Sequence, residues 1–245
     1  MYNLFLTVAG LKINFKLRSL QTELYFREFG GVSFTGDQSI SCPDLFVPAV
    51  KKDRLLNEHF RLGGTLGFAE YSLLLEAIAN PILKLSRFFF HGAAFIWKGQ
   101  AFLFVGKSGV GKTTMLRHWL NLYGEELEII NGDKPVIEQC ENHFIVHPSP
   151  WTGKEGWNGE RSARLAGIIC LEQGKTNSFI RIDKQSAVFP IFLQFLYQPT
   201  DETSVDLVCR YEQALLENVP VWRFISDGSS AAAVLAYNIL SEEAF

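Results

Sequence analysis

A glycine-rich segment near the middle of the chain combines residue types and a spacing that fit phosphate binding. Residues 106–113, GKSGVGKT, match the pattern G-x-x-x-x-G-K-[ST] at every fixed position. Glycines let the backbone turn so that successive N–H groups point at phosphate oxygens, and the positive end of a following helix adds to the attraction. Lys112 would neutralise the outer phosphates, and the Thr113 hydroxyl would bind magnesium. The segment therefore predicts a site for a nucleoside triphosphate, taken to be ATP, with Mg²⁺. The expected contact residues are Gly106, Lys107, Ser108, Gly109, Val110, Gly111, Lys112, Thr113 and Thr114.

Asp133 and His91 lie on either side of Lys112 in the sequence, each 21 residues away. Asp133 follows a short apolar run, and a parallel strand there would bring its carboxylate beside the phosphates as a magnesium ligand or a base. The sequence Asn-Gly-Asp at 131–133 is also a common turn, so a purely structural role stays open. His91 stands in an apolar run, where a hydrogen-bonded core histidine is the alternative to a catalytic one.

Residues 151–155, WTGKE, combine an aromatic ring, a glycine and a charge pair after a Pro-Ser-Pro turn. Trp151, Lys154 and Glu155 are candidates for contact with a substrate or a phosphate. The alternative is a solvated surface turn. The histidines show no ligand spacing on one helix face, so magnesium is the only metal that the sequence predicts.

The elements around the glycine-rich segment are those that a phosphate loop needs. Residues 101–105 form an apolar run typical of a buried strand, and the apolar residues of 112–123 predict a helix that ends at Gly124. Its inner face is predicted to hold Leu116, Trp119, Leu120 and Tyr123. Residues 87–96 are almost wholly apolar and predict one buried strand, with a turn at 98–99.

The rest of the chain predicts a mixed α/β organisation. Alternation in 2–9 and 11–17 predicts a hairpin, 29–43 is turn-rich, and a strand fragment is expected in 45–50. A helical period starts at Phe68, and Pro81 leaves its last turn uncertain. Further strands are expected at 127–131, 136–137, 144–146, 166–171 and 219–224, and a last helix at 230–240. We expect an N-terminal α+β region, 1–84, and a nucleotide-binding region, 85–245.

Composition excludes several classes of partner. A formal net charge of −3 gives no basic face for nucleic acid. No uninterrupted apolar run approaches the roughly 20 residues that cross a bilayer, and no basic leader precedes an apolar stretch. The four cysteines, at 42, 140, 170 and 209, lack disulfide or zinc spacing, so we expect reduced thiols and a cytoplasmic protein.

The motifs together resemble the bacterial HPr kinases and their relatives among the phosphoenolpyruvate carboxykinase-like kinases. The resemblance runs from about His91 to Leu171: His91-Gly92 ahead of the loop, the loop itself, Gly132-Asp133, and residues 162–171. Segments 130–135 and 150–155 are similar to a branch that includes lasso-peptide precursor kinases. The resemblance implies a P-loop kinase core that transfers the γ-phosphoryl group of ATP to a hydroxyl, with His91 near the phosphates and Asp133 as base or magnesium ligand.

The chain also departs from that family. Its tandem aspartates become Gly132-Asp133, and the glutamate and aspartate of its signature segment become Ser162 and Cys170. One carboxylate must therefore serve two roles, or another residue must help; Lys154 and Glu155 are the candidate replacements. These losses put HPr itself, and the reverse phosphorolysis reaction, in doubt.

Three functions follow as hypotheses. The leading one is a kinase acting on a serine of a small protein or peptide, with Asp133, His91 and Lys112 as catalytic residues and Thr113 and Asp133 holding Mg²⁺. The second is an ATP-binding sensor or accessory protein whose chemistry has decayed. The third, a GTPase, would normally show an Asn-Lys-x-Asp motif, which the sequence lacks. Whether the chain forms a homo-oligomer, and whether its N-terminal region recognises a substrate, are left open.

Overall fold

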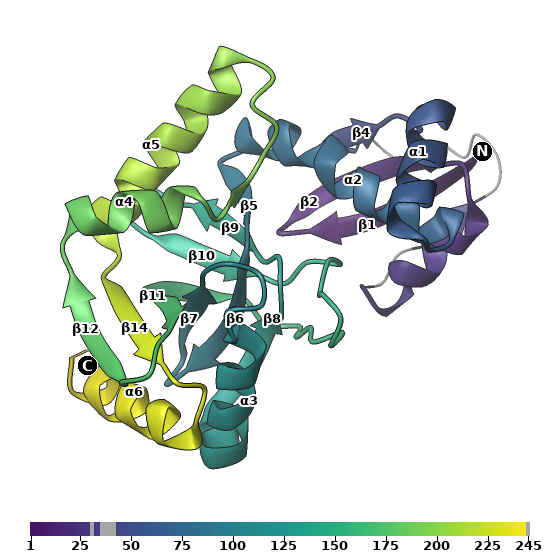
Figure 1. Cartoon of the computed structure of the whole chain (residues 1–245). Coiled ribbons are helices and arrows are strands. Elements are labelled where there is room, and N and C mark those ends of the chain that lie inside the picture. The colour runs from purple at the N-terminus through teal and green to yellow at the C-terminus, as the bar shows by residue number, and fades with distance from the viewer. Residues whose placement is uncertain (30–31, 35–42, 244–245) are drawn as a thin grey trace. The chain divides into compact units, whose positions relative to one another are not determined.

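The computed structural model describes residues 1–29, 32–34 and 43–243. The chain divides into two compact units, Met1–Leu85 and Ser86–Phe245 (Figure 1). Most of the segment predicted to be turn-rich, 29–43, lies outside the described residues, and so does Cys42. Each unit has its own sheet and helices, and the candidate site residues all belong to the second unit.

The sheet of the first unit is built on the predicted hairpin. Strands β1 (Tyr2–Val8) and β2 (Leu11–Leu17) pair antiparallel, and Ala9 and Gly10 between them both have positive φ, 49° and 77°. Two such residues give the turn whose twist matches that of the flanking strands. Strands β3 (Val32–Phe34) and β4 (Leu45–Val47) complete the order β3-β1-β2-β4. The hairpin prediction is confirmed, while β4 is shorter than expected because Pro48 follows it.

Two helices belong to the same unit, α1 (Lys52–Leu62) and α2 (Leu66–Leu83). The fully buried Glu70 of α2 accepts hydrogen bonds from the backbone N–H groups of Arg18 and Ser19 and from the Thr22 hydroxyl, at 2.7, 3.0 and 2.6 Å. These bonds attach α2 to the end of β2. The length and apolar composition of α2 would also suit a membrane span, but half of it is buried, and a core helix meets the same criterion.

The sheet of the second unit positions the candidate site. Its strands run in the order β13-β5-β9-β10-β11-β7-β6-β8, with β14 beside β11 and β12 beside β14. Strand β7 pairs parallel with β11 and antiparallel with β6, and β6 pairs antiparallel with β8. The carboxyl ends of β7, β8 and β11 therefore meet at one edge. The bounds are β5 (Arg87–Phe90), β6 (Gly92–Trp97), β7 (Gln100–Val105), β8 (Leu127–Asn131), β9 (Val136–Gln139), β10 (Phe144–His147), β11 (Ala163–Gln173), β12 (Ser178–Ile182), β13 (Phe195–Leu196) and β14 (Val221–Ser226).

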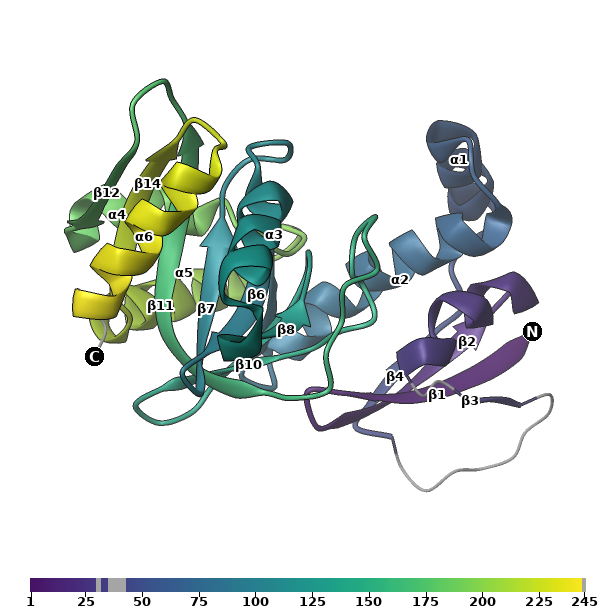
Figure 2. The same ribbon diagram turned by 90° about the horizontal axis from the view of Figure 1, so that it is seen from below.

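Helices cover this sheet. Figures 1 and 2 show α3 (Lys112–Tyr123) and α6 (Ser230–Glu243) side by side along one face, while α4 (Lys184–Phe192) and α5 (Glu202–Asn218) pack together elsewhere on the unit. Helix α3 has the predicted bounds, and Leu116 and Trp119 are fully buried as expected. The Trp119 ring packs edge-on against Trp97 of β6, at 5.8 Å between centroids. This packing anchors the helix that follows the glycine-rich segment.

One prediction about this sheet is wrong. The apolar run 87–96 is not one strand but two, because β5 pairs with β9 and β13 whereas β6 pairs with β7 and β8. His91 lies at the junction, outside both strands. Both strands are buried, so the apolar pattern contains no break to mark the change of partners. This change of partners occurs at a glycine, Gly92, where a Cβ would come within 3.0 Å of the Phe104 carbonyl oxygen.

Candidate functional site

The glycine loop, residues 106–111, joins the carboxyl end of β7 to α3. Gly106, Gly109 and Gly111 have φ of 137°, 79° and 107°, values that side-chain-bearing residues rarely adopt. A Cβ at Gly106 would lie 2.7 Å from the carbonyl oxygen of Leu171 in β11. The path of this loop therefore depends on glycine at the positions that the motif specifies.

Lys112 and the first turn of α3 make the loop electropositive. The Lys112 ammonium is largely enclosed and donates hydrogen bonds to the carbonyl oxygens of Gly106 and Lys107, at 2.8 and 3.2 Å. Burial lowers the pKa of Lys112, and the nearby Asp133 carboxylate partly opposes that shift. The backbone N–H groups of Lys112, Thr113 and Thr114 open the helix, where such groups have no intrahelical acceptor. A bound anion would satisfy the N–H groups and the ammonium together.

His91 and Asp133 meet beside Lys112. His91 Nε2 lies 3.5 Å from Asp133 Oδ1, and the backbone holds both residues in place: Gly92 N–H donates to the Asp133 carbonyl oxygen at 2.9 Å, and His91 N–H to that of Gln194 at 2.8 Å. Burial, with Lys112 adding to it and Asp133 opposing, lowers the pKa of His91 to about 4. The imidazole is therefore neutral at pH 7, and its contact with Asp133 is not an ion pair there.

Asp133 sits on a turn held by Asn131, which is fully buried. The Asn131 Oδ1 atom accepts from the N–H groups of Asp133 and Lys134, at 2.9 and 2.7 Å, and its Nδ2 donates to the Ser149 carbonyl oxygen at 2.9 Å. The two readings of Asn-Gly-Asp are thus compatible: the segment is a turn, and the turn aims a carboxylate at His91. Lys134 forms an ion pair with Asp133. The sequence reasoning missed Lys134 as a site residue, although its place next to Asp133 was a usable signal.

The segment 151–155 divides into a buried and an exposed part. Trp151 is only 2% exposed and packs edge-on against Phe89, at 5.3 Å between ring centroids, so it is a core residue. Gly153 borders the site, because a Cβ there would lie 2.9 Å from the Cβ of Asp133. Lys154 and Glu155 are exposed and make no ion pair within the described part of the chain. The structure brings this turn to Asp133 but does not bring Trp151 to the surface.

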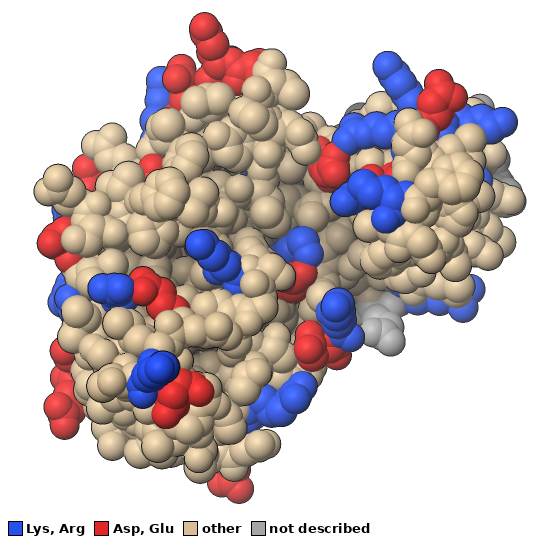
Figure 3. All heavy atoms as spheres, in the orientation of Figure 1, with Lys and Arg blue, Asp and Glu red and all other residues tan. Residues whose placement is uncertain are grey.

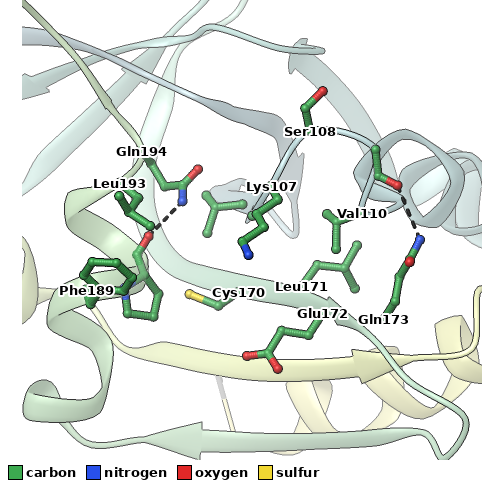
Figure 4. Close-up of a pocket in the computed structure, with 14 residues that line it drawn as sticks. Lys107, Ser108, Val110, Cys170, Leu171, Glu172, Gln173, Phe189, Leu193 and Gln194 are labelled. Carbon is green, nitrogen blue, oxygen red and sulfur yellow. Dashed lines mark hydrogen bonds between the residues drawn. The ribbon is translucent and has the colours of Figure 1, made fainter.

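A cavity of about 520 Å³ adjoins the glycine loop on the side of β11 and α4 (Figure 4). Its walls are residues 105–110, residues 170–173, and Phe189, Pro190, Leu193 and Gln194. Phe189 and Leu193 are 70% and 50% exposed. Burial raises the pKa of Cys170 to about 12, so its thiol stays protonated. The Gln194 Oε1 atom is buried without a hydrogen-bond partner among the described residues. Sequence reasoning identified the Cys170 position but none of the α4 residues.

The residues present fit magnesium bound together with phosphate. The described residues contain no group of three or more metal-ligating His, Cys, Asp or Glu side chains. Magnesium in phosphate sites usually takes one or two protein ligands and completes its shell with phosphate oxygens and water. Thr113, at the start of α3, and Asp133 could supply such a pair.

Charges over the visible surface of the second unit are interspersed. Lys and Arg alternate with Asp and Glu over the part of that unit seen in Figure 3. This mixture agrees with the net charge of −3 and supplies no basic stripe on that face.

Comparison with known proteins leaves the family undecided. No protein-family model matches the chain, and no curated protein is similar to it. A solved structure of the Hpr(Ser) kinase/phosphatase from Coxiella burnetii aligns with 63% of this chain and 89% of its own, at 13% identity and a TM-score of 0.35. Similarity at this level supports no conclusion about activity.

Proposed function

We propose that the chain is an ATP- and Mg²⁺-dependent kinase that transfers the γ-phosphoryl group to a hydroxyl. One observation carries the proposal: His91 and Asp133, far from Lys112 in the sequence, converge on it at the glycine loop, and Lys112 is coupled electrostatically to Asp133. A chance glycine turn would not require a histidine and a carboxylate at its mouth. A fixed array of donors around a transferable phosphate is what phosphoryl transfer needs.

In the proposed reaction the loop N–H groups and α3 hold the phosphates. The Lys112 ammonium exchanges its bonds to the Gly106 and Lys107 carbonyl oxygens for phosphate oxygens. The acceptor oxygen forms a bond to the γ-phosphorus as the bond to ADP breaks, and Asp133 orients the acceptor hydroxyl and takes its proton. Neutral His91 donates or accepts a hydrogen bond beside the γ-phosphate. Magnesium, when bound at Thr113 and Asp133, supplies neutralisation of the phosphate charge.

The acceptor class rests on the resemblance of the sequence motifs to HPr kinase-like proteins. We propose a serine on a small protein or peptide, including a ribosomally made peptide precursor, and a cytoplasmic setting. No nucleic acid partner enters the proposal, since the net charge is −3; no membrane partner enters it either, since the one helix among the described residues that is apolar enough to span a bilayer is half buried.

A second candidate is an ATP-binding sensor without turnover, and one contact favours it. Lys134 pairs with Asp133, the carboxylate on which the kinase hypothesis depends. If that pair persists when ATP binds, the Asp133 carboxylate is neither a full magnesium ligand nor a free base. The sensor would bind ATP with micromolar affinity and transfer nothing.

Transfer from labelled ATP separates the two candidates. Purified protein, γ-labelled ATP and Mg²⁺ are incubated with peptides and small proteins encoded beside the gene, and the products are identified by mass. The kinase predicts a serine-linked label that disappears when the acceptor serine is replaced by alanine and when Lys112→Ala is used. Transfer at an undiminished rate by Lys112→Ala would reject the proposed site. ATP binding without any labelled acceptor would favour the sensor.

A further inference from the structure

A row of hydrogen bonds away from the glycine loop joins a serine, a histidine and a glutamate. Ser162 Oγ lies 2.8 Å from His147 Nδ1, and His147 Nε2 lies 2.9 Å from Glu138 Oε2. Arg87 holds the other oxygen of Glu138 at 2.6 Å. A hydroxyl within reach of a base, with the base oriented by a third group, is the arrangement that activates a serine oxygen.

The protonation states suit this activation. A carboxylate accepts hydrogen bonds only, so His147 donates its Nε2–H to Glu138 and leaves Nδ1 free to accept the Ser162 proton. Burial lowers the pKa of His147, although the hydrogen bond to Glu138 opposes the shift. The ring is therefore neutral at pH 7 and able to take a proton.

Ser162 is accessible, whereas the groups behind it are mostly enclosed. It is an exposed residue in the irregular segment that precedes β11, and its exposed neighbours include Arg161 and Arg164. The side chains of His147 and Glu138 are only 15% and 22% exposed. Ser162 therefore presents an exposed hydroxyl directly before β11, where another molecule can reach it.

We propose that Ser162 is itself a phosphoryl acceptor, modified by the glycine-loop site of a second copy of this chain. The proposal rests on the proposed kinase function and names one substrate of that site. The Ser162 O–H bond breaks and its proton passes to His147 Nδ1. The oxygen forms a bond to the γ-phosphorus of ATP, and the bond from that phosphorus to the bridging oxygen breaks to release ADP.

The strand geometry argues against modification within one molecule. Ser162 precedes the amino end of β11, whereas the glycine loop lies beside Leu171 near the other end. Nine residues of strand separate the two positions by on the order of 30 Å. Both ends belong to one sheet of the second unit, and Ser162 is hydrogen-bonded to His147 on that sheet, so we expect the reaction to join two molecules.

This acceptor would resolve the shortage of acidic groups at the glycine loop. Asp133 is the one carboxylate there for two proposed roles, magnesium ligand and base. Because Ser162 arrives with His147 hydrogen-bonded to it, Asp133 can remain with magnesium. Arg161 already pairs with Glu128 at 2.7 Å, but the exposed Arg164 could pair with the new phosphate, a contact that stabilises phosphoserine.

The test incubates the full chain with ATP and Mg²⁺ and locates phosphate by peptide mass spectrometry. We expect one phosphate on Ser162, with an initial rate per molecule that rises with protein concentration. His147→Gln should slow this modification about 100-fold, the range of a lost general base, while leaving transfer to a separate serine peptide unchanged. Ser230→Ala, which removes another exposed serine, is the matched control and should leave the phosphate on Ser162.

The alternatives have distinct outcomes. Transfer to a serine peptide without phosphate on Ser162 would overturn this inference and keep the kinase. Phosphate on Ser162 at a rate independent of His147 would overturn the role of the hydrogen-bonded row. A wild-type protein that labels neither Ser162 nor any peptide would remove both this inference and the kinase proposal.

Discussion

The two sides of the glycine loop differ in what they offer a ligand. On the charged side, Asp133 contacts both His91 and Lys134, and Asp133 and Lys134 act electrostatically on Lys112. On the cavity side, α4 and Leu193, the residue after it, contribute an apolar wall in which Phe189 and Leu193 are 70% and 50% exposed. The same loop thus borders a charged region and an apolar region.

This difference predicts that turnover and binding can be changed separately. Charged groups at fixed positions stabilise developing charge, whereas apolar contact affects ground and transition states alike. Changes on the charged side should therefore lower turnover, and changes on the cavity side should weaken binding.

The largest effect is expected from Trp151, which lies behind the charged side. Trp151→Ala should lower the free energy of unfolding by about 3–5 kcal/mol, because a buried ring is lost and a cavity remains. Urea unfolding measures the change. Lys154→Ala, three residues away and exposed, should stay within about 0.5 kcal/mol of wild type. Equal effects of the two variants would mean that the Trp151 ring is not packed on Phe89.

Asp133→Asn should lower kcat by about 100-fold or more, since it removes the carboxylate that we propose to orient the acceptor and bind magnesium. The shape of the residue is kept, so unfolding by urea should change little. Steady-state transfer to a serine peptide measures kcat. Glu141→Gln, in an exposed turn, is the control for loss of one negative charge. A kcat unchanged by Asp133→Asn would show that the charged side does not carry out the chemical step.

His91 should make stability depend on pH. The folded-state pKa is about 4, against an ordinary value of 6.5. As pH falls below 6.5 the unfolded chain takes up a proton that the folded chain refuses, so the stability contributed by neutral His91 is present above pH 6.5 and lost towards pH 4. The loss is roughly 2–3 kcal/mol.

Urea unfolding of wild type and His91→Asn across this range isolates the effect of His91. The pKa of His147 is also lowered, but His147 is present in both proteins and cancels in the difference. Parallel pH curves for the two proteins would show that His91 is not held neutral beside Lys112.

The smallest effect is expected on the cavity side. Phe189→Ala should raise the KM of ATP or of the serine peptide, whichever occupies the cavity, by about 10-fold, the binding contribution of one partly buried ring. It should leave kcat within about twofold. Val188→Ala is the matched control, because Val188 is exposed on the same helix but does not line the cavity. A fall in kcat comparable to that of Asp133→Asn would show that the cavity side also contributes to the chemical step.

The charged side was largely predictable from the sequence, because its residues are marked by local signals. The glycine pattern specifies the loop, and residues 112–123 have a clear helical period. Asp133 follows a strand of the expected direction. What the sequence did not show is that His91 stands between two strands with different partners, since both strands are buried and the apolar pattern is continuous.

The cavity side was not predictable, because it depends on elements with weak local signals. Helix α4 contains Pro190, which argues against a helix in a sequence pattern. Helix α5 has better signals that were missed: the Asp201 side chain accepts from Ser204 N–H at its start, and Val208, Tyr211 and Leu215 are buried at helical spacing. Which helix faces the loop is decided by tertiary packing, and no local pattern encodes it.

Titration of ATP into the chain by calorimetry, with Mg²⁺ present, tests the central claim most directly, namely that the glycine loop is a phosphate site centred on Lys112. We predict one site of micromolar affinity in the wild type and binding weakened at least about 100-fold in Lys112→Ala, since a charge-assisted contact to phosphate is lost. Urea unfolding confirms that the variant is folded. Equal affinities of wild type and folded Lys112→Ala, or no binding by the wild type, would contradict this claim.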